Sequence, residues 1–101
     1  MTIEFINNLK EKTKTAKENL EIDVITEISK HDSDLMREME KAAERGINVA
    51  NVVYKLPTRY EVIKDKLKLI ITSYYNRPDL EIKVEILNNV IMFGYDIMIA
   101  W

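Results

Sequence analysis

Hydrophobic and polar positions along residues 2–30 repeat with the spacing of a helix. Apolar or small side chains recur every three or four residues, at Ile6, Leu9, Thr13, Ala16, Leu20, Val24 and Ile28. This spacing places them on one narrow stripe of an α-helix. Because a narrow stripe is typical of a helix that packs against another helix, we expect residues 2–30 to form a helix that contacts either its own chain or a second copy.

The charges on this predicted helix are segregated between its two halves. Four lysines lie in the first half, at positions 10, 12, 14 and 17, and acidic residues dominate the second half. Antiparallel pairing of two copies would bring opposite charges together. A solvated helix face with no partner explains the same charges equally well, so both interpretations stay open.

A second helix is predicted after the tetrapeptide HDSD at residues 31–34. Asp32 or Ser33 can accept hydrogen bonds from the first free amides of that helix. Arg45 and Gly46 form a suitable end, because a basic last turn precedes the residue that best tolerates a left-handed backbone. A continuous helix over residues 2–45 is the alternative.

The second half of the chain reads as strand, helix, strand, strand. Residues 47–54 are rich in β-branched side chains, and residues 80–87 alternate apolar and charged positions without interruption. Thr58 and Glu61 predict a capping box at the start of a helix that ends near residue 75. Asn88 and Asn89 suit a two-residue hairpin turn leading into a last strand over residues 90–101.

That turn fixes a predicted register for the terminal hairpin. It pairs Val84 with Phe93, Ile82 with Tyr95, and Glu81 with Asp96. The last strand is apolar on both faces except at Asp96, so we expect it in the centre of the sheet, in the order second, third, first. The prediction is an α+β fold with N-terminal helices, a β-α-β-β unit and a three-stranded sheet.

Length and composition set limits on this fold. The 101 residues predict a single domain, with a helical region over 1–45 and a β-α-β-β region over 46–101. The chain has no Cys, which excludes disulfides and thiolate chemistry and fits a reducing compartment. The formal net charge of −2 provides no general attraction for nucleic acid, and no signal sequence or membrane-spanning run is evident. We therefore expect a cytoplasmic protein.

Catalytic and metal-binding patterns are sparse. His31 lies beside Asp32 and Asp34, a set that could hold a metal weakly, although capping is the commoner role. Glu81 and Asp96 could act as an acid and a base in a small hydrolase, but an adjacent lysine and the common use of charges on sheet edges make this the last choice. The sequence therefore predicts no enzyme, no metal and no cofactor.

Residues 55–77 combine basic and aromatic side chains, a composition that suits a nucleotide or single-stranded nucleic acid. Such a binding module is the alternative function, using Arg59, Lys64, Lys68, Tyr75 and Arg77. Val62 and Leu69 lie off the apolar stripe of the same predicted helix. They suggest a second, smaller contact surface.

The segment from AAERG through a strand, an amphipathic helix and a terminal hairpin ending in IMIAW covers about residues 39–101. Its layout resembles small accessory proteins of bacteriophages and other large DNA viruses. The resemblance implies a protein that acts by binding, either occupying a host protein or sequestering a small signal molecule.

We therefore expect a small non-enzymatic interaction protein that forms a homo-oligomer, with the N-terminal helix as one contact surface. Its other partners would be a host protein or a small anionic ligand; a membrane is not expected, and nucleic acid ranks behind both. The predicted contact residues are Arg59, Val62, Lys64, Lys68, Leu69, Tyr75, Arg77, Met92, Asp96 and Met98.

Overall fold

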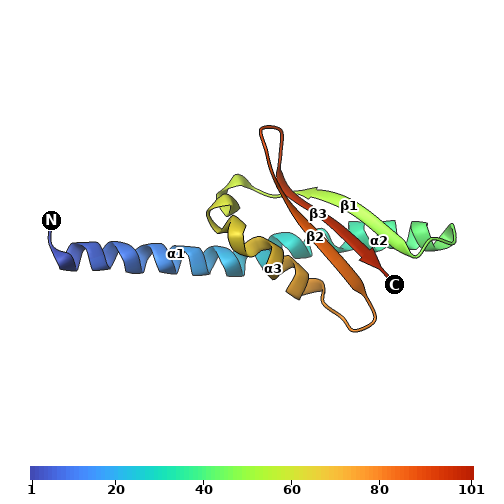
Figure 1. The fold of residues 1–101 in the computed structure, drawn as a ribbon, viewed down its shortest axis with the longest axis horizontal. Coiled ribbons are helices and arrows are strands. Elements are labelled where there is room, and N and C mark those ends of the chain that lie inside the picture. Colours follow the sequence, from blue (N-terminus) through green and yellow to red (C-terminus); the bar gives the residue numbers. More distant parts are fainter.

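A computed structural model describes residues 1–101 and confirms the α+β class (Figure 1). Two N-terminal helices precede a strand, a helical segment and a terminal hairpin. The elements are α1 (Ile3–Ser29), α2 (Asp32–Glu44), β1 (Val49–Lys55), the 3-10 helix η1 (Thr58–Ile63), α3 (Lys64–Tyr75), β2 (Glu81–Asn88) and β3 (Phe93–Ala100). No helix is both long enough and apolar enough to cross a membrane.

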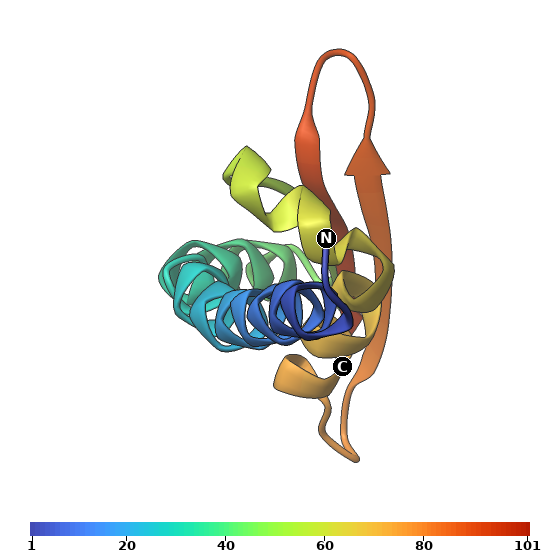
Figure 2. The ribbon, with the colours of Figure 1, turned by 90° about the vertical axis from the view of Figure 1, so that its left-hand side faces the viewer.

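The three strands form one antiparallel sheet in the order β1-β3-β2, so the prediction of a central last strand is confirmed. β1 and β2 are each antiparallel to β3 and are joined by η1 and α3. All helices lie on one side of the sheet (Figure 2). We call the other side, which no helix covers, the outer face.

The predicted hairpin register is wrong by four residues. Ile82 pairs with Ile99 and Val84 pairs with Ile97, because the loop spans residues 89–92 and is not a two-residue turn. The Asn89 side chain accepts hydrogen bonds from the amides of Ile91 and Met92, at 2.9 and 3.0 Å. This side-chain cap stabilises the wider turn. A shift of four preserves the strand faces, so the apolar residues still face the helices.

The predicted break between the first two helices is confirmed, but two predicted side-chain caps do not form. The break between α1 and α2 lies at residues 30–31, which excludes a continuous helix. No side-chain hydrogen bond caps the start of α2, and the Thr58–Glu61 capping box does not form, because that segment is a 3-10 helix following Pro57. Gly46 has a φ of 76°, as its place at the end of α2 predicts.

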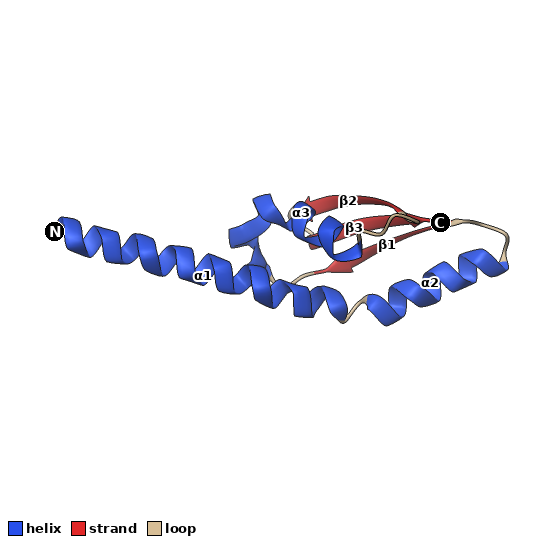
Figure 3. Ribbon diagram, turned by 90° about the horizontal axis from the view of Figure 1, so that it is seen from below, coloured by secondary structure: helices blue, strands red, loops and turns tan.

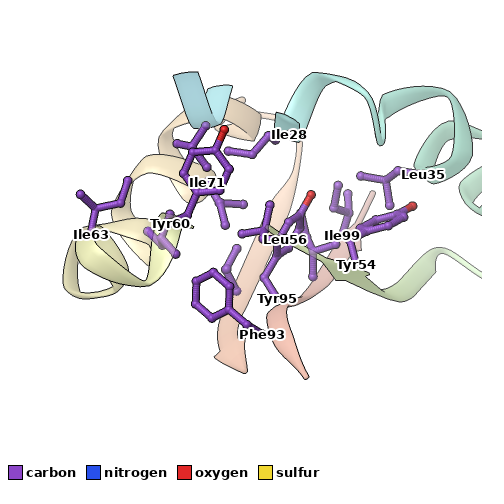
Figure 4. Close-up of a cluster of buried hydrophobic side chains, with 14 residues drawn as sticks. Ile28, Leu35, Tyr54, Leu56, Tyr60, Ile63, Ile71, Phe93, Tyr95 and Ile99 are labelled. Carbon is purple, nitrogen blue, oxygen red and sulfur yellow. The ribbon is translucent and has the colours of Figure 1, made fainter. Parts of the chain in front are cut away.

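The core lies between the sheet and the helices (Figure 4). β3 supplies Tyr95 and Ile97, α3 supplies Ile71, and the second half of α1 supplies Val24 and Ile28; all five side chains have no exposed surface. Burial of one large apolar side chain contributes about 1.5–3 kcal/mol. These contacts hold the last third of α1 firmly against the body of the protein.

The first part of α1 projects away from the body. Leu20 is the first residue of α1 that packs against the core, and residues 3–19 form a helical extension that we call the arm. The molecule measures 64 Å along its longest axis, against 32 and 18 Å along the others. Figures 1 and 3 show the arm extending alone beyond the sheet and the other helices.

Candidate functional site

A cavity of about 490 Å³ opens between α2 and the end of α3. Its size falls within the usual range for small-molecule sites. α2 provides one wall, and the end of α3 with the following turn provides the other. The lining residues are Asp32, Leu35, Met36, Met39, Tyr74, Tyr75, Arg77, Asp79, Leu80 and Ile99.

The cavity exists because α2 and α3 pack on different parts of the sheet. α2 contacts β1, whereas α3 contacts β2, and the two helices share no comparable contact. The apolar face of α2 therefore covers the sheet with Leu35 but leaves Met36 at the cavity mouth, 67% exposed. Methionine side chains are flexible, so Met36 can adjust its conformation to the contents of the cavity.

The polar end of the cavity is built around Asp32. Its two carboxylate oxygens accept hydrogen bonds from the hydroxyls of Tyr74 and Tyr75, at 2.7 and 2.8 Å. The hydrogen bond to Asp32 raises the pKa of Tyr74, and burial together with the same carboxylate raises the pKa of Tyr75. Both tyrosines therefore stay protonated at neutral pH and donate to Asp32, which has no ion-pair partner.

Arg77 and Asp79 form a paired unit at the rim of the cavity. Arg77 donates through Nε and a terminal nitrogen to the two carboxylate oxygens of Asp79, each at 3.1 Å. The guanidinium is thus already matched by a carboxylate. The charges of Arg77 and Asp79 cancel. The residues that line the cavity therefore have a formal net charge of −1, which comes from Asp32.

A second tyrosine cluster lies next to this cavity. His31 stacks on Tyr54 with ring centroids 4.4 Å apart, and its Nδ1 lies 2.6 Å from the Tyr95 hydroxyl. Tyr54 donates to Asp34 at 2.7 Å. Burial lowers the pKa of His31, even though Glu27, Asp34 and Asp32 act to raise it.

These hydrogen bonds replace the capping roles predicted for the HDSD segment. His31, Asp32 and Asp34 each bind a different tyrosine or pair of tyrosines. The structure gathers no group of three metal-ligating side chains here or elsewhere. The segment therefore fastens α2 to the sheet and to α3.

Tyr75 and Arg77 are the only predicted contact residues that share the cavity. Arg59 instead lies over the ring of Tyr60, 4.5 Å from its centroid, and forms ion pairs with α1. Lys64 and Lys68 are exposed on α3; they neither line the cavity nor take part in the ion pairs of Arg59 with α1. The basic segment is thus divided among three places and forms no single surface.

Leu69 belongs to a different apolar groove. It lies beside Ile22 and Ile25 of α1, and these three side chains are all exposed, with Leu69 at 70%. Val62 lies apart, in η1. Sequence reasoning missed the two isoleucines because they lie off the apolar stripe of α1.

Asp96 and Met98 lie on the outer face of the sheet, and Met92 lies in the hairpin loop just before β3. Asp96 pairs with Glu85 across the sheet, so the predicted pairing of Asp96 with Glu81 is wrong. Asp96 accepts a hydrogen bond from Asn51 of β1 at 2.7 Å. The acid and base pair considered for a hydrolase therefore does not form.

No protein-family profile matches the chain, and no curated protein or solved structure matches it.

Proposed function

We propose that this protein is a non-enzymatic interaction protein that acts by binding and assembles as a homodimer through its arm. The observation that carries the proposal is the uncovered apolar stripe of the arm. Leu9 is 45% exposed, whereas Val24 and Ile28, on the same stripe, are fully buried in the body; Phe5, beside the stripe, is 50% exposed.

A helix of this length needs support from tertiary contacts. Isolated helices shorter than about 12–15 residues are marginal in water, and longer ones depend strongly on sequence. The arm contains residues such as Thr13 and Asn8 that add little helical preference. A second arm lying along the stripe would supply the missing contacts.

The proposed arrangement of the two arms is antiparallel. It places Leu9 of one arm opposite Ala16 of the other, with Thr13 near the two-fold axis and Ile6 near Leu20 of the partner. Full burial of a large apolar side chain contributes about 1.5–3 kcal/mol, and covering the exposed part of Leu9 would contribute a fraction of this. Two copies of each contact occur in the symmetric pair.

Charge plays a smaller part than the sequence suggested. The acidic half of α1 already forms ion pairs within its own chain: Glu21 with Lys66 at 3.0 Å and Glu27 with Lys30 at 3.0 Å. Lys10 and Lys17 flank the same edge of the stripe, so antiparallel arms bring them close together. Exposed charge pairs are worth about 0.2–1 kcal/mol, so apolar burial outweighs this repulsion.

Light scattering of the purified protein at micromolar concentration tests the proposal. We expect a mass of twice 11.9 kDa for the unaltered chain. Leu9→Asp should give the monomer mass, because it places a charge in the seam. Val90→Asp is the matched control, since Val90 is fully exposed at the hairpin tip, and it should remain dimeric.

A monomer mass for the unaltered chain would refute the proposal. So would dissociation by Leu69→Asp while Leu9→Asp stays dimeric, because the groove beside α3 would then be the interface.

A further inference from the structure

We infer that the cavity between α2 and the end of α3 binds a small primary ammonium compound with an apolar body. The inference names a ligand class for the proposed binding function. It does not depend on pairing of the arms, since the cavity lies at the opposite end of α1.

The charge of the cavity selects a cation. Asp32 lies half-buried and accepts hydrogen bonds from tyrosine hydroxyls, but no Lys, Arg or His forms an ion pair with it. The one guanidinium in the lining, that of Arg77, is bound on two nitrogens by Asp79. A ligand ammonium would supply the positive charge that this carboxylate lacks.

The arrangement of acceptors favours an amine with N–H groups. A carboxylate offers about four lone-pair positions, and the two tyrosines occupy two of those on Asp32. Tyr74 donates its proton to Asp32, so its oxygen can still accept a hydrogen bond, whereas the Tyr75 hydroxyl also lies within hydrogen-bond reach of Tyr95. The two remaining positions on Asp32 and the Tyr74 hydroxyl thus provide three acceptors for the three N–H groups of a primary ammonium.

The remaining walls suit an apolar body. Leu35, Met36, Met39, Leu80 and Ile99 surround the space beyond Asp32. The tyrosine rings add electron-rich faces that attract cations. An anion of the same shape would face the unpaired carboxylate and would have to displace Asp79 from Arg77.

Isothermal titration calorimetry with three probes of similar shape tests the inference. The probes are phenethylammonium, its neutral counterpart 2-phenylethanol, and the anion 3-phenylpropanoate. We expect one phenethylammonium per chain, bound at least about tenfold more tightly than 2-phenylethanol, and no binding of the anion. Equal affinities for the three probes, preference for the anion, or no saturable binding of phenethylammonium would overturn the inference.

Substitutions test whether the ammonium probe binds in this cavity. Asp32→Asn should abolish the preference for the ammonium over the alcohol, whereas Glu40→Gln, which removes the same charge from an exposed position on α2, should retain it. If circular dichroism shows that Asp32→Asn is unfolded, Met36→Lys carries the test, because it places a competing cation at the exposed cavity mouth. Retained preference in the folded cavity variant would also overturn the inference.

A lysine side chain from another copy also carries a primary ammonium group and is the other source of a cation for the cavity. Titration of the Leu9→Asp variant distinguishes this lysine from a small-molecule ligand. We expect its affinity for phenethylammonium to equal that of the unaltered chain within about twofold. A tenfold rise on loss of the dimer would show that a lysine of the second copy fills the cavity, against a small-molecule ligand. Masses measured on the same samples report separately on the arm.

Discussion

The two halves of α1 carry the same apolar stripe but have different surroundings. In the body half, Val24 and Ile28 are buried against α3 and η1, whereas in the arm Leu9 remains 45% exposed. Hydrophobic periodicity therefore shows which face of a helix is to be covered. It does not show whether the same chain covers it.

The boundary between the halves is marked by polar contacts as well as by packing. The Tyr60 hydroxyl donates to Asp23 at 2.5 Å, and Lys66 forms an ion pair with Glu21 at 3.0 Å. The hydrogen bond from Tyr60, with the nearby Arg59, holds the pKa of Asp23 below its usual value. N-terminal to Glu21, no residue of α1 has such a partner in the body.

The largest expected difference is in stability. Ile28→Ala should lower the free energy of unfolding by about 2–5 kcal/mol, because it leaves a cavity in the core. Leu9→Ala, measured at a concentration where the protein is monomeric, should change it by less than about 0.5 kcal/mol. Urea denaturation followed by circular dichroism measures both. Similar losses for the two variants would contradict the division into arm and body.

Substitution by alanine should also affect the body and the arm differently. A Cβ at Gly94 would overlap the backbone oxygen of Tyr54 in the adjacent strand, so Gly94→Ala should lower the free energy of unfolding by about 1–3 kcal/mol. Asn8→Ala in the exposed arm should leave stability unchanged or raise it by a few tenths of a kcal/mol, about the gain in helix preference. Thermal melts of both variants test this contrast, and an unchanged melting temperature for Gly94→Ala would refute it.

Acid should weaken the body and leave the arm unaffected. Burial lowers the pKa of His31 in the folded state from its ordinary value of 6.5, so the unfolded chain binds the proton first as the pH falls. The free energy of unfolding should therefore decrease as the pH drops below 6.5 towards the folded pKa. His31→Gln should remove this dependence, and the dimer mass should stay constant over the same range. A gain in stability on acidification would contradict the account.

Salt should have the smallest effect, and its sign is informative. The proposed antiparallel pairing would bring Lys10 of one arm close to Lys17 of the other, so screening should tighten the proposed dimer slightly, by about 0.2–1 kcal/mol per pair at most. Sedimentation at low and high sodium chloride concentration measures the change. Dissociation by salt would show that opposite charges hold the copies together.

Much of the fold could be predicted from local patterns. The alternating strand, the two-faced apolar last strand and the helix stop at Gly46 each follow from a few neighbouring residues, and each is confirmed. The hairpin register could not, because the side chain of Asn89 decides between a two-residue and a four-residue turn of similar composition.

The cavity was harder to predict because its residues are distant in the sequence. Asp32 meets Tyr75 only when α2 and α3 are placed on the same side of the sheet. Tyr54 and Tyr95 come together because they pair across the first and last strands. The sequence predicted that these two strands are neighbours, but it gave no register for their pairing. The sequence therefore assigned Asp32 to capping, and it predicted Tyr75 and Arg77 as contact residues without placing them beside Asp32.

Disulfide trapping tests the pairing of the arms most directly, because the chain has no native Cys. Leu9→Cys and Ala16→Cys are oxidised separately and as a mixture, with Val90→Cys as an exposed control. Antiparallel pairing of the arms predicts rapid cross-linking of Leu9→Cys to Ala16→Cys in the mixture and slow cross-linking of either variant alone. Cross-linking of the mixture no faster than that of the Val90→Cys control would contradict it.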